Sequence, residues 1–391
     1  MEMTRLEEGI VRYGTPLYVF HIDEMRENFK RFRSILQDRA GLCFAMKANP
    51  FLTSQMNTLA DRIEVCSMGE FQICKKRQIH AENILVSGVM KKKEDIFTIL
   101  NEYRGKCTYT IESLNQFHCF AEWCDANSEL LHVYLRLTSG NQFGMDLATI
   151  ENIIEVRDMC PFLKIQGIHY FSGTQKKIEK TKEELKKLDV ILRELEEKTN
   201  FLIEELEYGP GLFVPYFSGQ KDTVESDLQE IADAISRMQW KGSVMLEMGR
   251  ALVAKCGYYL TSVRDIKQTD GKNYCIVDGG IHQINYDGQI RGMYQPMIRV
   301  SPEHTKAEMV EWTVCGSLCT VNDVLVQKVD MPRLRIGSVL IFERTGAYAM
   351  TEGMSMFLSH ELPQIAFYSK EMGWKLVRRE YQTYEKNMEE F

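Results

Sequence analysis

Residues 42–50 read LCFAMKANP, an apolar run that ends in one lysine, Lys47, with small residues after it. A short apolar run is typical of a buried strand. A lysine at the end of such a strand must extend into a cavity or to solvent, since burying its charge without a partner is costly. Its amine can then take part in Schiff-base chemistry. Taken alone, a lysine that reaches solvent from a strand end is the more common explanation.

The composition is that of an ordinary globular protein, with 391 residues, 44% hydrophobic and 26% charged. This length is sufficient for two domains. The formal net charge of -7, without a long basic run, argues against nucleic acid or an anionic membrane as the main partner. The charged first residues do not resemble a signal peptide, and no apolar run reaches transmembrane length.

The chain has eleven cysteines without a CxxC pair, and eight histidines without metal-ligand spacing. We therefore expect reduced thiols, a cytoplasmic location and no metal site.

Eight short apolar runs alternate with helical segments before about residue 258. Such alternation predicts parallel β/α units, and eight units close a barrel. An open doubly wound sheet is the alternative, but no GxGxxG opens the first unit. The runs are LCFAM (42–46), RIEVC (62–66), NILVS (83–87), CTYTI (107–111), LHVYLRL (131–137), LKIQGI (163–168), LIEELEY (202–208) and SVMLEM (243–248).

After this point strands follow one another with little helix, which predicts a separate antiparallel β-domain, either a barrel or a sandwich. The strand-like run TPLYVFH (15–21) is expected to pair with that domain. The predicted division is a (β/α)8 barrel over 22–257 and a β-domain formed by 1–21 and 258–391.

Chemically distinctive residues fall at the carboxyl ends of the predicted barrel strands, where β/α barrels carry their active sites. Glycines at 173, 209 and 211 can offer backbone N–H groups to a phosphate, and Glu247 would suit a protonated ring nitrogen. Each glycine alone is explained by a turn, and Glu247 by an ion pair, but amine, phosphate cradle and carboxylate together are what pyridoxal phosphate requires. The residues at these strand ends are Lys47, Glu64, Arg136, His169, Gly209, Gly211, Glu247, Gly249 and Arg250.

Nine motifs along nearly the whole chain resemble the fold-type III pyridoxal-phosphate decarboxylases, the diaminopimelate, ornithine and arginine type with an alanine-racemase-like barrel. They occur in the order expected for that family. The motifs are FAMKANP, EVCSMGE, LRLTSGNQFGM, GIHYFSGTQ, YGPGLFVPY, LEMGRALVAKCG, VDGG, CGSLCTVNDVL and GAYAM.

The resemblance implies a role for each residue and a homodimer with a shared active site. Lys47 would bind the cofactor covalently, and Glu247 would face the pyridine nitrogen. Cys319 would come from the partner subunit and protonate the carbanion; without the resemblance it would be assigned as a buried, inert cysteine. The phosphate would be held by Thr174, Gly211, Arg250 and Tyr348. The remaining cofactor contacts are expected from Glu64, Arg136, His169, Phe171, Gly209 and Gly249, and substrate contacts from Asp278, Thr320 and Asp323.

Four positions depart from the family pattern. Phe171 replaces a histidine on the ring face, and Pro210 removes one N–H from the glycine turn. Ser317 replaces a proline, a minor change. Thr320 replaces the acid that pairs with a distal ammonium, so we expect poor use of lysine, ornithine and diaminopimelate.

The resemblance therefore implies an amino-acid decarboxylase whose L- or D-substrate lacks a distal ammonium, and the motif GSLCTVND looks like the branch found beside carrier-protein or peptide-natural-product pathways. The alternatives are a diaminopimelate decarboxylase proper, an amino-acid racemase on the same fold, and a catalytically dead paralogue that binds a partner. Glu247 and Cys319 favour decarboxylation over racemisation.

Overall fold

The computed structural model describes residues 1–88, 91–286, 289, 291–303 and 308–390. Its contacts divide the chain into two compact units. The barrel unit comprises Phe29–Val214 and Thr223–Ala251, and the sheet unit comprises Met1–Asn28, Pro215–Asp222 and Leu252–Phe391. The division into a barrel domain over 22–257 and a β-domain formed by 1–21 and 258–391 stays a prediction.

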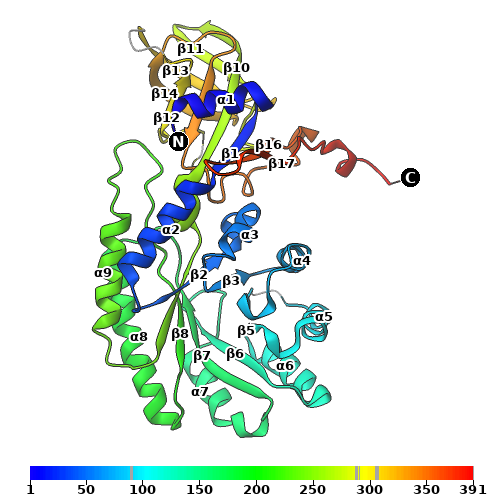
Figure 1. Ribbon diagram of the computed structural model, residues 1–391, viewed down its shortest axis with the longest axis vertical. Coiled ribbons are helices and arrows are strands. Elements are labelled where there is room, and N and C mark those ends of the chain that lie inside the picture. Colours follow the sequence, from blue (N-terminus) through cyan, green and yellow to red (C-terminus); the bar gives the residue numbers. More distant parts are fainter. Residues whose placement is uncertain (89–90, 287–288, 290, 304–307, 391) are drawn as a thin grey trace. The chain divides into compact units, whose positions relative to one another are not determined.

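The barrel unit is built on eight parallel strands that close into a barrel (Figure 1). All eight predicted runs form its strands, in sequence order, and the predicted (β/α)8 barrel is confirmed. The strands are β2 (Gly41–Ala45), β3 (Arg62–Val65), β4 (Ile84–Val86), β5 (Thr108–Ile111), β6 (Leu131–Leu137), β7 (Leu163–Phe171), β8 (Glu205–Gly209) and β9 (Ser243–Met248).

Helices connect successive strands, and their sequences explain both their starts and their buried faces. The N-cap side chains of Ser67, Ser113 and Asp146 each accept a backbone N–H of the first turn. The longest helix, α8, buries leucines at helical spacing, as the sequence indicates. The helices are α3 (Thr53–Met56), α4 (Met68–Lys76), α5 (Lys93–Tyr103), α6 (Leu114–Asn127), α7 (Leu147–Glu155), α8 (Ile178–Thr199) and α9 (Val224–Ser236), with 3-10 turns η1 (Met46–Ala48), η2 (Pro50–Leu52), η3 (Ala81–Asn83), η4 (Arg104–Lys106) and η5 (Arg157–Met159).

The chain passes between the units at four points: one in α2 (Ile22–Leu36), one in α10 (Arg250–Val253), and two on either side of Pro215–Asp222, between β8 and α9. The strand before α2 and the strand after α10 both belong to the sheet unit. The predicted strand at 15–21 is β1 (Leu17–His21), which pairs with β10 (Gly257–Thr269) and with β16 (Gln364–Ser369). Both parts of the sequence assigned to the β-domain therefore contribute to one sheet.

The sheet unit contains a nine-stranded sheet that is mostly antiparallel. The predicted antiparallel β-domain is confirmed for most strand pairs, but two pairs are parallel: β1 with β16, and β11 with β13. Parallel pairs need long connections, and a local strand pattern contains no information about them. The other strands are β11 (Lys272–Val277), β12 (Ile298–Ser301), β13 (Met309–Cys315), β14 (Val324–Pro332), β15 (Val339–Glu343) and β17 (Gly373–Arg378), with 3-10 turns η6 (Ala254–Cys256), η7 (Phe357–Ser359) and η8 (Tyr384–Lys386).

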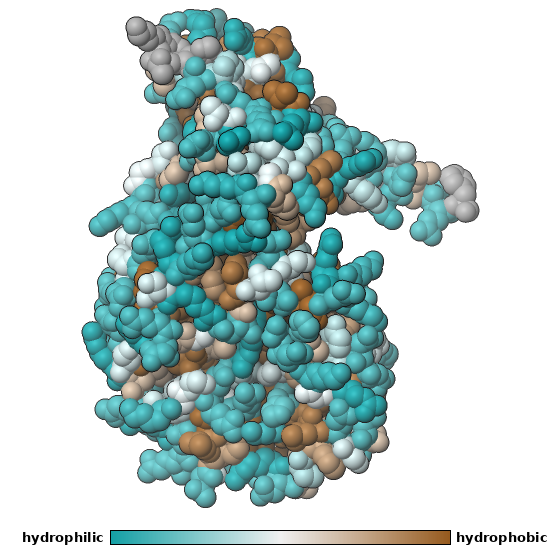
Figure 2. Space-filling model, viewed as in Figure 1, coloured by the Kyte–Doolittle hydropathy of each residue, from teal (hydrophilic) through white to brown (hydrophobic). Residues whose placement is uncertain are grey.

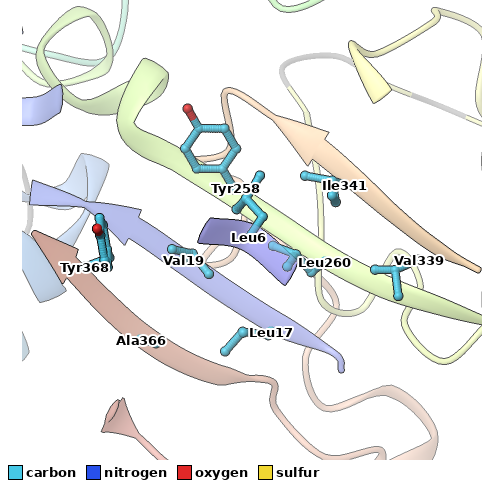
Figure 3. Packing of buried hydrophobic residues seen from close by; sticks show 9 residues of the cluster. All are labelled: Leu6, Leu17, Val19, Tyr258, Leu260, Val339, Ile341, Ala366 and Tyr368. Carbon is cyan, nitrogen blue, oxygen red and sulfur yellow. The ribbon is translucent and has the colours of Figure 1, made fainter. Parts of the chain in front are cut away.

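A helix that the sequence did not predict, α1 (Met3–Tyr13), packs on this sheet. Its Leu6 is fully buried against side chains from four strands (Figure 3). These neighbours are Leu17 and Val19 of β1, Tyr258 and Leu260 of β10, Val339 and Ile341 of β15, and Ala366 and Tyr368 of β16. The sheet unit thus has a hydrophobic core of its own.

On the face drawn in Figure 2, hydrophilic residues predominate and hydrophobic ones occur in small separate patches. Scattered apolar residues are normal on a protein surface. Within the described residues, no helix combines the length and the apolar character needed to cross a membrane.

Candidate active site

Lys47 lies directly after β2, in the turn η1. In the barrel β2 pairs with β3 on one side and with β9 on the other, and each neighbour contributes a carboxylate. Lys47 Nζ donates to Glu64 Oε2 at 2.6 Å and to Glu247 Oε1 at 3.3 Å. The lysine side chain is 35% exposed, whereas the two carboxylates are 3% and 5% exposed. The two carboxylates thus fix the position of the amine, which remains accessible to solvent.

Glu247 is held as a carboxylate although it is buried. Burial alone would raise its pKa, but the charge of Lys47, together with His169 and Arg136, lowers the pKa well below its usual value. His169 Nε2 lies 3.1 Å from Glu247 Oε2. Neither of these two atoms forms a hydrogen bond with another described residue. The buried oxygen Oε2 is therefore available to an N–H donor.

Glu64 is surrounded by further donors that sequence reasoning missed. Its Oε1 accepts from Ser87 Oγ at 2.5 Å and from Cys66 Sγ at 2.8 Å. Cys66 Sγ also lies 3.6 Å from Lys47 Nζ, and burial raises the pKa of this thiol well above its usual value. Both residues end or follow predicted strands, so the strand-end rule that selected Glu64 could have selected them.

Arg136, at the end of β6, forms a buried ion pair with Glu112, which follows β5. Arg136 Nη1 lies 2.8 Å from Glu112 Oε1, and the guanidinium lies 4.7 Å from the centre of the Phe143 ring. In the strand register Arg136 is opposite His169. Glu112 was not predicted, because a single glutamate after a strand has no distinguishing pattern.

Two loops at the ends of β7 and β8 are joined into one cradle. Lys176 N–H donates to Gly211 O at 2.9 Å. The Gln175 side-chain amide donates to Val214 O at 3.0 Å and accepts from Val214 N–H at 2.8 Å. Gly211 has a φ of +60°, and a β-carbon there would lie 2.1 Å from Gly173 O. Only glycine allows this contact.

The cradle presents unpaired N–H donors. The backbone N–H groups of Gly173, Thr174 and Gly211 donate to none of the described residues. Phe171 packs against Gly209, where a β-carbon would lie 2.4 Å from Phe171 Cδ2. The three backbone N–H groups at 173, 174 and 211 suit an anion with several oxygens.

The end of β9 approaches the turn that carries Lys47. A β-carbon on Gly249 would lie 2.7 Å from Ala48 Cβ, so a larger residue would push the two strand ends apart. Arg250 follows Gly249 and is buried. The barrel unit therefore brings the predicted residues at positions 47, 64, 136, 169, 209, 211, 247, 249 and 250 to the carboxyl ends of its strands.

Five predicted residues belong to the sheet unit, and their place in the same site stays a prediction. Cys319 is exposed, and Thr320 lies beside it. The nearby Asp323 accepts N–H groups from Leu318 at 2.7 Å and Ile281 at 2.9 Å. Its carboxylate thus ties the loop that carries Cys319 to the turn after β11.

Asp278 has a similar structural role, since it accepts from Thr15 Oγ1 and Thr261 Oγ1, both at 2.7 Å, and pairs with Arg264. Tyr348 adopts a φ of +61°, a region that bulky residues rarely occupy and that occurs disproportionately at functional sites. No group of three or more potential metal ligands occurs in the part of the chain that the structure describes.

A family model described as pyridoxal-dependent decarboxylase, C-terminal sheet domain, matches residues 17–346. Among curated proteins, an L-glutamyl-[BtrI acyl-carrier protein] decarboxylase of Niallia circulans is 27% identical and aligns over 94% of this chain and 92% of its own. A 2-[(L-alanin-3-ylcarbamoyl)methyl]-2-hydroxybutanedioate decarboxylase of Staphylococcus aureus is 24% identical over 90% of this chain and 93% of its own.

Among solved structures, a diaminopimelate decarboxylase of Methanocaldococcus jannaschii superposes with a TM-score of 0.85. It covers 96% of this chain and 92% of its own, at 24% identity. At that identity the likeness shows the fold.

Proposed function

Because the chain belongs to the pyridoxal-dependent decarboxylases, we propose that it releases carbon dioxide from an amino acid whose side chain ends in an acyl, amide or carrier-linked group. Its family makes it a carboxy-lyase that uses pyridoxal phosphate. The observation that carries the assignment of its active site is the position of Lys47 between Glu64 and Glu247.

The residues of the barrel unit fit this cofactor. Lys47 Nζ would bind it covalently. Glu247 Oε2, a buried acceptor without a described partner, would accept the N–H of the protonated pyridine ring. The unpaired N–H groups at 173, 174 and 211, together with Arg250, would hold its phosphate. A contact from Tyr348 of the sheet unit is proposed from the family resemblance alone. When bound, the cofactor supplies an electron sink for the pair left behind as carbon dioxide departs.

The chain's own residues supply proton transfer and orientation. Glu64 Oε2, 2.6 Å from Lys47 Nζ, is placed to take a proton from the amine and to return it. Glu247 stays ionised because of Lys47 and can keep a ring nitrogen protonated. Phe171 packs on Gly209, where its apolar ring would keep water from one face of the cofactor. Cys319 Sγ would donate the proton that replaces the carboxylate.

The substrate class follows from Thr320. A threonine cannot neutralise a distal ammonium, and a buried ammonium without a partner is costly. Two relatives support a side chain of another kind: the names of the Niallia and Staphylococcus enzymes specify a glutamyl group on a carrier protein and a carbamoyl derivative. Diaminopimelate is the competing substrate, named for the M. jannaschii structure.

The test is carbon dioxide release over a panel of free and carrier-linked amino acids. The panel contains a glutamyl carrier thioester, an N-acylated diaminopropionate, diaminopimelate, lysine and ornithine, with Lys47→Ala as the inactive control. We expect turnover of one of the acylated substrates and weak turnover of the three with a distal ammonium. Thr320→Glu should raise carbon dioxide release from diaminopimelate, lysine and ornithine relative to wild type. Efficient turnover of diaminopimelate by the wild type would replace this proposal by the competing one.

We also propose a homodimer in which the partner subunit supplies Cys319. The exposed thiol on a loop that Asp323 holds in shape supports this, because a proton donor must be both accessible and fixed. Sedimentation should show a dimer, and mixing inactive Lys47→Ala and Cys319→Ala proteins should restore activity. If this mixture stays inactive although the subunits exchange, the active site is not shared between subunits.

The proposed location is a reducing compartment such as the cytoplasm. All eleven cysteines are free thiols, and Cys66 lies beside Lys47. Oxidation of that thiol would alter the surroundings of the amine, so an enzyme of this design is better suited to reducing conditions.

A further inference from the structure

A buried ion pair packs against the two loops of the proposed phosphate cradle. Lys176 Nζ lies 2.5 Å from Glu184 Oε2, and the two side chains are only 3% and 8% exposed. The Lys176 stem reaches the other loop, because its Cε would lie 2.8 Å from a β-carbon on Gly211. One lysine therefore supports both the loop that contains it and the glycine turn after β8.

The pair belongs to a closed hydrogen-bond network. Lys176 Nζ also donates to Ser172 Oγ at 2.9 Å, and Ser172 Oγ donates to Glu184 Oε1 at 2.6 Å. Tyr208 OH donates to Glu184 Oε2 at 2.9 Å. These groups come from the loop after β7, from α8 and from β8. The network thus fixes Ser172, which directly precedes the unpaired N–H groups of Gly173 and Thr174.

Each member of the pair favours the charged form of the other. Burial alone lowers the pKa of Lys176, and Glu184 opposes that effect. Burial alone would raise the pKa of Glu184, but hydrogen bonds from Lys176 and Ser172 bring it below its usual value. A buried ion pair contributes little net stability compared with apolar residues of similar volume, so global stability does not explain its presence.

The glycine turn gives a reason for the pair. Pro210 has no N–H, so the turn at 209–211 offers a phosphate fewer backbone donors than three glycines would. The orientation of the remaining donors at 173, 174 and 211 then matters more. Their orientation depends on the contact between Gly173 and Gly211, against which Lys176 packs.

We infer that Lys176 and Glu184 are positioning residues that hold the two loops in the geometry that binds the cofactor's phosphate, and that they compensate for the N–H missing at Pro210. This inference rests on the proposed cofactor site. It assigns a function in phosphate affinity to two residues that touch neither substrate nor cofactor.

The test compares cofactor binding in the wild type and in the double variant Lys176→Met/Glu184→Met, which keeps unbranched side chains and leaves no buried charge without a partner. Apoprotein is titrated with pyridoxal phosphate, and the phosphorus resonance of the bound phosphate is recorded. We expect the variant to melt near the wild-type temperature, to bind about tenfold more weakly, and to show a shifted or broadened resonance.

A matched control is available on the same helix. Lys182 of α8 pairs with Glu230 of α9 at 2.6 Å, but the two side chains are 36% and 46% exposed. Lys182→Met/Glu230→Met should leave both affinity and resonance unchanged. Adding Pro210→Ala to the first double variant restores an N–H and should recover part of the lost affinity. If the first double variant does not fold, Glu184→Gln, which keeps the size of the side chain, is measured in the same way and should weaken binding to a smaller extent.

Wild-type affinity with an unchanged resonance in the folded Lys176/Glu184 variant, or in Glu184→Gln, would make the pair a purely structural feature and overturn the inference. Failure of Pro210→Ala to recover affinity would overturn the compensation. Failure of the wild type itself to bind pyridoxal phosphate would instead contradict the proposed cofactor site, so the two failures are distinguishable.

Discussion

Each end of the barrel holds a cation between carboxylates, but the two ends differ in how completely the cation is bonded. At the carboxyl ends of the strands, Lys47 contacts Glu64 and Glu247. At the amino ends, Arg62 of β3 contacts Glu205 and Glu207 of β8. The barrel thus repeats one motif of charges with a lysine at one end and an arginine at the other.

The arginine end is closed. Arg62 donates through two nitrogens to both oxygens of Glu205, and further to Glu207 Oε2 at 3.2 Å and to Tyr134 OH at 2.7 Å. Its side chain is 16% exposed, against 35% for Lys47. A planar guanidinium suits fixed bidentate bonding, whereas a lysine amine can exchange partners and lose its proton.

This difference indicates that the two ends of the barrel have different roles. In β/α barrels the carboxyl end carries the chemistry and the amino end stability. A cation between two carboxylates can therefore serve catalysis or stability. Which of the two it serves depends on whether the cation is a lysine or an arginine and on how accessible it is. Variants at the two ends should separate these effects.

The largest expected effect is that of Lys47→Ala on activity. Removing the amine should lower carbon dioxide release by roughly a thousandfold or more and remove the visible absorption of the bound cofactor. The protein should also lose some stability, because the buried Glu64 and Glu247 lose a partner, but less than Arg62→Met does, since Lys47 is 35% exposed. Activity and absorption retained in this variant would show that the amine is not the attachment point.

The next effect in size is that of Arg62→Met on stability. Removing one member of a buried charge cluster costs about 3–5 kcal/mol, because the carboxylates lose their partner. Urea unfolding should show this loss, while the folded fraction should still bind pyridoxal phosphate. A variant as stable as the wild type but defective in cofactor binding would reverse the assignment of the two ends.

The barrel was predictable because its pattern is local. Each strand is a short apolar run followed by a helix, and eight repetitions leave few alternatives. The sheet unit was less predictable, since β1 and β16 lie at opposite ends of the chain and pair through long-range contacts. Helix α1 was missed because its apolar residues become meaningful only against the sheet that buries Leu6.

The residues of the candidate active site were likewise predictable only where the pattern is local. Lys47, Glu64 and Glu247 could be grouped because parallel strand ends meet at one edge of a barrel. Glu112, Cys66 and Ser87 obey the same rule, but each is too common a residue to stand out without its partners. Nothing in the sequence indicated that Lys176 of one loop would support Gly211 of another, because that contact depends on the three-dimensional path of both loops.

The smallest expected effects are those of replacing one glutamate by glutamine at each end of the barrel. The two glutamates are Glu207 at the amino ends of the strands and Glu247 at the carboxyl ends. Burial raises the pKa of Glu207 well above its usual value of 4.5, and Glu247 and Glu205 add to this against the single Arg62. A carboxyl group with a raised pKa binds more protons in the folded than in the unfolded state. Its contribution to stability is therefore complete below about pH 4.5 and is lost as the pH rises.

Glutamine cannot titrate, so Glu207→Gln should differ from the wild type by about 1 kcal/mol or less and should gain stability relative to it as the pH rises above that range. Carbon dioxide release should be unchanged. Glu247→Gln is the matched variant: it removes a carboxylate that Lys47 keeps ionised, and should lower release by about tenfold or more. Urea unfolding at a series of pH values and carbon dioxide release measure both. If Glu207→Gln lost activity and Glu247→Gln retained it, the catalytic carboxylate would be Glu207, at the amino ends of the strands, and not Glu247.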